Sequence, residues 1–473
     1  MFIFHSIESY HQSLLNGQTS CEEAVLHYFE KIKQDAHLNA WLEIYEEEAL
    51  IQAKKLDESR LAGKTVGKLH GVITGLKDVI CYKGHKVSAS SLILENFTSL
   101  YNATATQQLL NEDAIIIGRQ NCDEFAMGGS NENSAYGHVK NPNDVERVSG
   151  GSSGGSAVAV KAGHCMISLG SDTGGSVRQP ADFCGVIGMK PTYGTISRYG
   201  LIAYASSFDQ IGIFANSIED VSLVLDVISG ADEFDSTAIQ ENFIKQEVGQ
   251  TKEKFKICYF KNAIEHTALD KNISNSIKGF IDKLSSEGHA VEAINFDLLE
   301  YIVPTYYILT TAEASSNLSR FDGVKYGYRN KNEENDLLQM YKLSRSEGFG
   351  AEVKRRILLG TFVLSEGYYD AYFTKAQQVR KLLIDETTSI FEKYDAIILP
   401  TSPTPAFKIG EMKDPIEIFL ADIYTVFANL VGIPAISIPL FKTPDGLPFG
   451  LQVMADKKND LLLLSISKKM MEL

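Results

Sequence analysis

Two glycine–serine runs lie close together in the chain, and both are embedded between apolar segments. The first, GGSSGGS, covers residues 150–156, and the second, GSDTGGS, covers residues 170–176. The apolar residues 157–160 follow the first run, and residues 166–169 lead into the second. Flexible linkers share this composition, but they are not flanked by compact apolar segments. Glycine permits left-handed turns and close approach of backbone N–H groups to a ligand. The two runs therefore predict site-forming loops inside a packed domain.

Composition indicates a soluble globular protein rather than a nucleic-acid-binding or disulfide-bonded one. The 473 residues are 44% hydrophobic and 22% charged, and the net charge is -15. A charge of this sign argues against direct, non-specific binding to nucleic acid, which needs a basic surface. Six scattered cysteines without a CxxC pair predict free thiols and no metal site.

The N-terminus has no features of a secretory or membrane protein. It opens with MFIFH and then turns polar, without the basic and apolar regions of a signal peptide. No stretch approaches the ~18–20 apolar residues of a membrane span. We expect a cytoplasmic protein that makes no membrane contact.

Predicted strands alternate with predicted helices, which indicates an α/β layer fold. Ser20 and Glu23 form a capping-box pattern in a first segment that is expected to be helical, residues 1–65. Residues 66–212 are expected to carry the catalytic loops, and no composition break divides the 473 residues into separate domains. Strands are predicted at 70–76, 114–118, 166–169, 255–260, 290–294, 396–399, 435–438 and 451–454, and helices near 156, at 272–284 and within 351–394.

Two familiar chemistries fit the glycine–serine runs poorly. A phosphate-binding P-loop needs a first glycine where Glu58 stands before Gly63-Lys64-Thr65, and neither run is followed by lysine. A nucleophile elbow of the G-x-S-x-G type needs a late histidine as base. The last histidine is His289, well before the C-terminus.

A mechanism without histidine remains, in which lysine acts as the general base for Ser176. An ordinary lysine has a pKa of ~10.4 and is almost fully protonated at neutral pH. Burial can lower that pKa by about three units. Lys77 is a candidate, because it follows the apolar residues 71–76 at a predicted strand end.

These spaced elements resemble the amidase signature family. The family's Gly-Gly-Ser-Ser-Gly-Gly loop corresponds to residues 150–155, and its Asp-x-Gly-Gly-Ser element to residues 172–176. Ser152 lies 75 residues after Lys77 and 24 before Ser176, and these separations are characteristic of the family. The resemblance implies an α/β amidase signature fold, with a large mixed central sheet covered by helices on both faces.

The resemblance also implies a role for each residue of a Ser–cis-Ser–Lys triad. Ser176 is then the nucleophile, Ser152 the bridging serine with a cis peptide bond before it, and Lys77 the base. The backbone N–H groups proposed for the oxyanion hole are those of Thr173, Gly174, Gly175 and Ser176. Asp172 and Arg178 flank the nucleophile and are expected to brace the loops.

Within this family, the chain is similar to the amidase subunits of tRNA-dependent amidotransferases. Residues 123–130, 312–323 and 344–356 carry this likeness. It implies that glutamine is bound by Arg356 at its α-carboxylate and by Asp422 at its α-amino group, which suits a zwitterion. The other implied substrate-binding residues are Tyr307, Met127 and Gly128. The neighbouring pairs Tyr306/Tyr307 and Arg355/Arg356 leave the register of two of these positions open.

The implied function is hydrolysis of glutamine to supply ammonia for converting Glu-tRNA(Gln), or Asp-tRNA(Asn), to the amidated tRNA. The implied partners are the B and C subunits of such an enzyme, with the tRNA held mainly by the partner. ATP and Mg²⁺ would be used by the partner, and no cofactor is expected in this chain. The alternative is a free-standing amidase that acts on another small amide.

Two features depart from the family pattern. Phe427 stands where proline is common, near Asp422, and is expected to reshape the substrate wall. The sequence ends at Leu473, slightly early for the family, which predicts a trimmed terminal helix.

Overall fold

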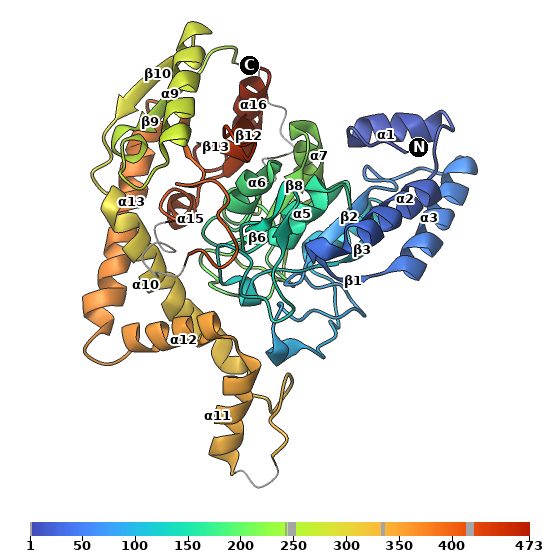
Figure 1. Ribbon diagram of the computed structural model, residues 1–473, viewed down its shortest axis with the longest axis horizontal. Helices are drawn as coiled ribbons and strands as arrows, with labels where there is room; N and C mark the ends of the chain where they lie inside the picture. Colours follow the sequence, from blue (N-terminus) through green and yellow to red (C-terminus); the bar gives the residue numbers. More distant parts are fainter. Residues whose placement is uncertain (1, 242–243, 245–251, 333–335, 413–420) are drawn as a thin grey trace.

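One mixed sheet of 11 strands runs through the part of the chain that the structure describes (Figure 1). This computed structural model describes residues 2–241, 244, 252–332, 336–412 and 421–473. The strand order is β1-β3-β2-β6-β8-β7-β12-β13-β11-β9-β10. Parallel pairs occur at β3-β2-β6 and at β11-β9-β10, and the other neighbours are antiparallel. The prediction of a large mixed sheet is confirmed.

The N-terminal segment contributes a strand as well as helices. Its elements are α1 (Ile7–Leu15), α2 (Cys21–Gln34), β1 (Trp41–Ile44) and α3 (Glu46–Leu61). The expectation of an all-helical segment was wrong at β1, which pairs antiparallel with β3 at the sheet edge. The four residues of β1, WLEI, include Glu43 and lack the continuous apolar run by which other short strands were predicted. Ser20 caps α2 by accepting from the N–H of Glu23, but the carboxylate of Glu23 accepts from Thr19.

The central segment carries the strands that position the glycine–serine loops. Its elements are β2 (Ile73–Lys77), α4 (Thr104–Asn111), β3 (Ile115–Gln120), β4 (Lys140–Asn141), β5 (Asp144–Val148), α5 (Gly154–Lys161), β6 (Ile167–Asp172), α6 (Arg178–Cys184), β7 (Ile187–Lys190), β8 (Gln210–Ala215) and α7 (Ile218–Ile228). The predictions for β2, β3, α5 and β6 are confirmed. Strands β4, β5, β7 and β8 were not predicted.

The C-terminal segment completes the sheet and supplies long helices beside it. Its elements are β9 (Lys256–Phe260), α8 (Lys261–Ile264), α9 (Lys271–Ser286), β10 (Ala290–Ile294), α10 (Leu299–Asn317), α11 (Leu337–Gly348), α12 (Ala351–Val363), α13 (Lys375–Phe391), β11 (Ala396–Pro400), α15 (Val426–Val431), β12 (Ala435–Lys442), β13 (Pro448–Met454) and α16 (Asp460–Met471). The predicted β9–α9–β10 unit is confirmed, with its two strands parallel. The helical stretch predicted within 351–394 is two helices, α12 and α13, with a π-helical turn before the second.

Helices cover both faces of the sheet and enclose a large hydrophobic core. Helices α5 and α6 pack on each other and on the sheet, and α7 and α16 form a second group. The main core extends from Ile7 in α1 to Met470 in α16, and a separate small cluster contains Val148, Phe183 and Ala406. Among the described residues, no helix combines the length and the apolar character that a membrane crossing requires.

Helices α10 and α12 approach each other closely, because α12 has a glycine at the crossing. A Cβ placed on Gly360 would lie 1.9 Å from the carbonyl oxygen of Thr311 on α10. Each of the two helices carries a predicted substrate-binding residue, Tyr307 on α10 and Arg356 on α12. The distance between these two helices therefore affects how far apart Tyr307 and Arg356 lie.

Gly360→Ala should destabilise the protein by about 1–3 kcal/mol, because the added methyl group forces α10 and α12 apart. Gly279→Ala is the matched control, since Gly279 lies inside α9 with open space around its Cα. There, alanine should stabilise the helix by about 0.5–1 kcal/mol. Urea denaturation followed by circular dichroism measures both changes. Equal effects of the two substitutions would contradict the close-packing explanation.

Candidate active site

Lys77 lies at the carboxyl end of β2, beside the carboxyl end of β6. The two strands are parallel neighbours, with Thr74 opposite Ile167 and Leu76 opposite Leu169. Parallel neighbours end at the same edge of a sheet, where open α/β sheets bind their ligands. The second glycine–serine run continues β6 into this edge. Sheet topology thus brings Lys77 and the nucleophile loop together.

The amine of Lys77 is surrounded by hydroxyl groups. Its Nζ lies 2.7 Å from Ser152 Oγ, 2.9 Å from Ser153 Oγ and 2.9 Å from Ser171 Oγ. Burial lowers the pKa of Lys77 to about 8, against the opposing effect of Cys122 and three buried aspartates, Asp123, Asp172 and Asp209. A substantial fraction of the amine is therefore uncharged in mildly alkaline solution, as a general base requires.

Ser152 follows a cis peptide bond, as the family resemblance implied. The cis bond joins Gly151 to Ser152, and Ser152 is fully buried. Its carbonyl oxygen accepts from the backbone N–H of Asp123 at 3.0 Å. The N–H of Gly151 donates to the carbonyl oxygen of Gly129 at 3.0 Å. Both residues of this turn are thereby tied to the segment that follows β3.

Ser176 begins the turn that leads into α6, next to the first glycine–serine run. Its carbonyl oxygen accepts from the N–H of Ser153 at 3.1 Å, so the two predicted loops meet through backbone. Ser176 is 8% exposed, whereas Lys77 and Ser152 have no exposed surface. This gradient suits a nucleophile that meets substrate and a base that stays shielded from water.

The predicted oxyanion donors differ in what they contact. The N–H of Gly175 donates to Asp172 Oδ1 at 2.9 Å. Contrary to the prediction, this amide therefore stabilises the loop rather than pointing to an oxyanion. The amides of Thr173, Gly174 and Ser176 remain the proposed donors. A Cβ on Gly174 would lie 2.4 Å from Tyr306 Oη, which explains why glycine is required there.

Asp172 and Arg178 brace the nucleophile loop, as expected. The two side chains are fully buried, and Arg178 Nη2 lies 2.9 Å from Asp172 Oδ1. Burial opposes the charge of Asp172, but Arg178 holds the pKa of that carboxyl well below its ordinary range. Arg178 also donates to Thr425 O at 2.7 Å and to Asn429 Oδ1 at 2.6 Å. The brace therefore extends from the nucleophile loop to α15.

A small cavity of about 200 Å³ lies beside the catalytic loops. Two predicted substrate-binding residues, Gly128 and Arg356, line it. A third, Asp422, lies against Gly129 in its wall, since a Cβ on that glycine would be 3.7 Å from Asp422 Oδ1. The cavity is also lined by Ser130, Glu132, Asn133, Gln179, Glu352, Arg355, Phe407, Met412 and Ala421.

The two members of each neighbouring pair, Tyr306/Tyr307 and Arg355/Arg356, occupy distinct positions. Tyr307 Oη donates to Asp422 Oδ2 at 2.7 Å, while Tyr306 packs against the nucleophile loop. Arg356 has 6% of its side chain exposed, against 37% for Arg355. Tyr307 is therefore the tyrosine that contacts Asp422, and Arg356 is the more buried of the two arginines that line the cavity.

Arg356 is held by two residues that the sequence analysis missed. Its Nε lies 2.7 Å from Glu352 Oε1, and its Nη1 donates to Tyr204 Oη at 2.7 Å. Glu352 stands four residues before Arg356 on α12, a helical spacing that would have revealed the ion pair. The contact with Tyr204 spans 152 positions and has no comparable sequence signal.

Met127 and Phe427 both lie in the protein interior. Met127 is fully buried, beside Gly128 rather than in the cavity lining. Phe427 is also fully buried and packs edge-on against Phe260 and Phe296. The expectation that Phe427 reshapes the substrate wall is therefore not supported, because its ring lies in this aromatic cluster.

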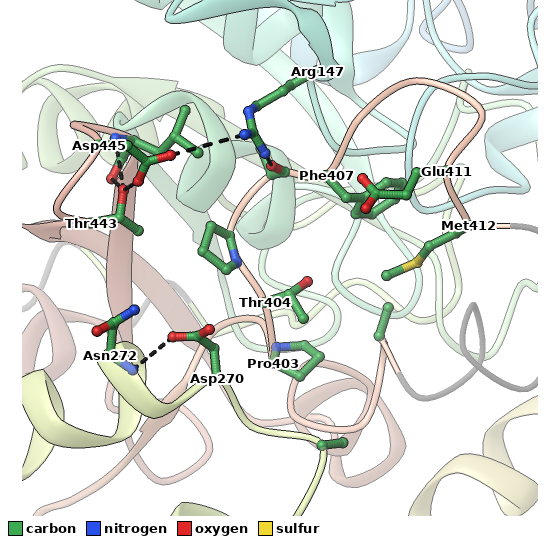
Figure 2. Close-up of a pocket in the computed structure, with 15 residues that line it drawn as sticks. Arg147, Asp270, Asn272, Pro403, Thr404, Phe407, Glu411, Met412, Thr443 and Asp445 are labelled. Atoms are coloured by element: carbon green, nitrogen blue, oxygen red, sulfur yellow. Dashed lines mark hydrogen bonds and ion pairs between the residues drawn. The ribbon is translucent and has the colours of Figure 1, made fainter.

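A larger cavity of about 570 Å³ adjoins the first one, and Figure 2 shows the residues around it. The two cavities share Phe407, Met412 and Ala421. Arg147 donates to the carbonyl oxygen of Ala406 at 2.6 Å, and Asp270 accepts from the N–H of Asn272 at 2.7 Å (Figure 2). Among the described residues of its lining there is neither serine nor lysine. The predicted substrate-binding residues Gly128 and Arg356 line the smaller cavity and not this one.

The mixed sheet and the lysine–serine arrangement define a serine amidase, and comparison with known proteins agrees. The family model described as Amidase matches residues 23–464. The chain belongs to the amidase family.

More specific relatives cover nearly the whole chain. It is 49% identical over 468 residues to the A subunit of glutamyl-tRNA(Gln) amidotransferase from Chlorobium phaeobacteroides, covering 98% of each chain. The corresponding protein of Koribacter versatilis is 50% identical over 444 residues, covering 93% of this chain and 92% of that one. The crystal structure of the corresponding Thermotoga maritima protein is similar with a TM-score of 0.78 and 38% identity, covering 98% of this chain and 93% of that one.

Labelling of Ser176 by a sulfonyl fluoride should accelerate as pH rises and level off above about pH 8. The uncharged amine of Lys77 is the reactive form, and its pKa is lowered to about 8. Lys77→Ala should lose labelling and the pH dependence together. Mass spectrometry of the modified peptide measures the rate. A flat profile between pH 6 and pH 9 in the unmodified protein would contradict the lysine base.

Ser152→Ala and Ser153→Ala should separate the bridging hydroxyl from its neighbour, although both contact Lys77. Ser152→Ala removes the proposed proton relay and should slow labelling by at least ~10²-fold. Ser153→Ala should be milder, because Ser153 Oγ also donates to the carbonyl oxygen of Ser171 and has a structural role. The same labelling assay compares them. The reverse order would assign the relay to Ser153.

Proposed function

We propose that this chain is the glutamine-hydrolysing subunit of a tRNA-dependent amidotransferase. The observation that carries the proposal is the buried amine of Lys77, 2.7 Å from Ser152 Oγ, near a pocket that is lined by Arg356 and has Asp422 next to Gly129 of its wall. The relatives named as the A subunit of glutamyl-tRNA(Gln) amidotransferase, at 46–50% identity over most of the chain, support the same assignment.

In the proposed mechanism, Ser176 Oγ attacks the side-chain amide carbon of glutamine. The Ser176 proton passes to Ser152, and the Ser152 proton passes to the uncharged amine of Lys77. The resulting tetrahedral intermediate collapses when the amide nitrogen takes a proton back along this path and leaves as ammonia. Water then attacks the γ-glutamyl ester by the same relay, which releases glutamate and restores Ser176. This is general acid–base catalysis of nucleophilic acyl transfer.

The negative charge of each tetrahedral intermediate needs hydrogen-bond donors that are already in place. The backbone amides of Thr173, Gly174 and Ser176 are the proposed donors. One such donor stabilises the transition state by ~3–4 kcal/mol. The Asp172–Arg178 brace holds the loop that carries them, so the donors need not reorganise during reaction.

Opposite charges in the pocket suit the α-carboxylate and α-amino groups of glutamine. Arg356 supplies the cation, and its guanidinium also lies 5.5 Å from the ring centre of Tyr307. Asp422 supplies the anion. Burial raises the pKa of Asp422 to about 6, although the hydrogen bond from Tyr307 opposes this rise. Above that pH, Asp422 is ionised and ready to pair with an ammonium group.

Ammonia made here would be used by the partner B and C subunits, with ATP, Mg²⁺ and mischarged tRNA bound mainly on the partner. The net charge of -15 supports this division, since a strongly acidic chain repels the phosphates of tRNA and ATP. No cofactor is required for the hydrolysis itself, because the lysine–serine relay supplies both base and acid.

Arg356→Lys should raise KM for glutamine by about tenfold or more, because lysine cannot form a bidentate pair with a carboxylate. Asp422→Asn should raise KM similarly by removing the partner of the α-amino group. The matched control is Arg355→Lys on the same helix, where the more exposed side chain should matter less. Steady-state ammonia release measures all three. An equal rise in KM for both arginine variants would contradict the assignment of Arg356.

The function itself is tested by adding the partner subunits. Purified chain should release ammonia from glutamine, and addition of the B and C subunits with ATP, Mg²⁺ and Glu-tRNA(Gln) should yield Gln-tRNA(Gln). Ser176→Ala should abolish glutamine-dependent amidation while leaving amidation with added ammonium salt. A chain that hydrolyses other small amides efficiently, ignores glutamine and gains nothing from partners would be a free-standing amidase.

A further inference from the structure

Asp123 lies between the substrate pocket and the catalytic turn, and its carboxylate is fully buried. Asp123 Oδ2 accepts from the N–H of Asn131 at 2.9 Å, and Oδ1 accepts from the N–H of Asn133 at 3.0 Å. These bonds fold back residues 127–133, five of which line the small cavity. One carboxylate therefore organises this wall of the pocket.

The same residue holds the turn that carries the bridging serine. The N–H of Asp123 donates to Ser152 O at 3.0 Å. The side-chain oxygen of Asn131, which Asp123 positions, accepts from the N–H of Gly154 at 2.9 Å. Pocket wall and catalytic turn are thus joined through Asp123 by several hydrogen bonds.

The carboxylate packs closely against two glycines. A Cβ on Gly151 would lie 2.1 Å from Asp123 Oδ2, and a Cβ on Gly128 would lie 2.3 Å from Asp123 Cγ. The carboxylate therefore fills the space between the pocket wall and the cis peptide. Glycine at both positions is explained by this side chain.

Asp123 differs from the other two carboxylates near Lys77 in the groups that its side chain contacts. Four groups act on the amine, namely Cys122, Asp123, Asp172 and Asp209. Asp172 pairs with Arg178, and Asp209 accepts from Thr173 Oγ1 at 2.6 Å. Within the described residues, no lysine or arginine forms an ion pair with Asp123. Burial raises the pKa of Asp123 to about 6, so it is ionised where Lys77 titrates.

We propose that Asp123 is a positioning residue of the amide hydrolysis: its carboxylate locks the pocket wall to the Ser152 turn, and its negative charge acts on the amine of Lys77. The proposal takes its reaction, amide hydrolysis, from the proposed function, whereas the contacts of Asp123 do not depend on that function. A purely structural residue would share the first role. The second role distinguishes the proposal, because it predicts a change in pH dependence.

The test is the pH profile of Ser176 labelling by a sulfonyl fluoride in full-length Asp123→Asn. Removal of a negative charge disfavours the protonated amine, so the rise in rate should move to lower pH by about half a unit or more. The plateau rate should fall by about tenfold or more, because the turn loses its brace. Asp123→Ser, smaller and uncharged, is the second variant if asparagine disturbs folding. Circular dichroism verifies that each variant is folded.

Glu124→Gln is the matched control, because Glu124 is the adjacent buried carboxylate but bonds to Ser91 and to the N–H of Gly350 instead. Its profile should keep the original midpoint. A folded Asp123 variant with an unmoved midpoint would overturn the inference, as would an equal shift in Glu124→Gln. Failure of the unmodified protein to be labelled at Ser176 would instead refute the proposed function.

Discussion

Exclusion of water from the amine of Lys77 is the physical constraint on which the site depends. Burial lowers the pKa of this group from its ordinary value to about 8, which corresponds to about 3 kcal/mol. The folded state binds this proton less tightly than the unfolded chain. The resulting destabilisation is fully present below about pH 8 and disappears as pH rises toward the unfolded pKa. The folded protein is therefore less stable at neutral pH than it would be with an ordinary lysine, and this loss of stability accompanies a reactive base.

The contacts of Lys77 show how a buried amine stays reactive without becoming a permanent cation. In the described residues, its nearest partners are the hydroxyl groups of Ser152, Ser153 and Ser171. Hydroxyl groups can donate to an uncharged amine or accept from a charged one, so they satisfy it in both protonation states. A carboxylate in direct contact would favour the charged form and remove the base.

The sequence was sufficient to predict the reacting residues but not the residues that hold them in place. The resemblance to the amidase signature family predicted that Lys77 and Ser152 lie together, and the two side chains are in contact. The Glu352–Arg356 ion pair was within reach of a helical-spacing argument. The contact of Arg356 with Tyr204 was not, and neither was the burial of Phe427 against Phe260, because both depend on tertiary packing between distant segments. Strand β1 was missed because Glu43 interrupts its apolar residues.

Glycine at the catalytic edge reflects the close approach of three separate segments. The nucleophile loop lies against Tyr306 and Thr425, where Gly174 and Gly175 leave no room for a Cβ. Thr425 in turn accepts from Arg178 through its carbonyl oxygen. The proposed substrate-binding residues and the proposed reacting residues are therefore parts of one packed unit. Any change that separates α10 or α15 from the sheet should also displace the proposed oxyanion donors, so the proposed binding and catalytic groups depend on the same packing.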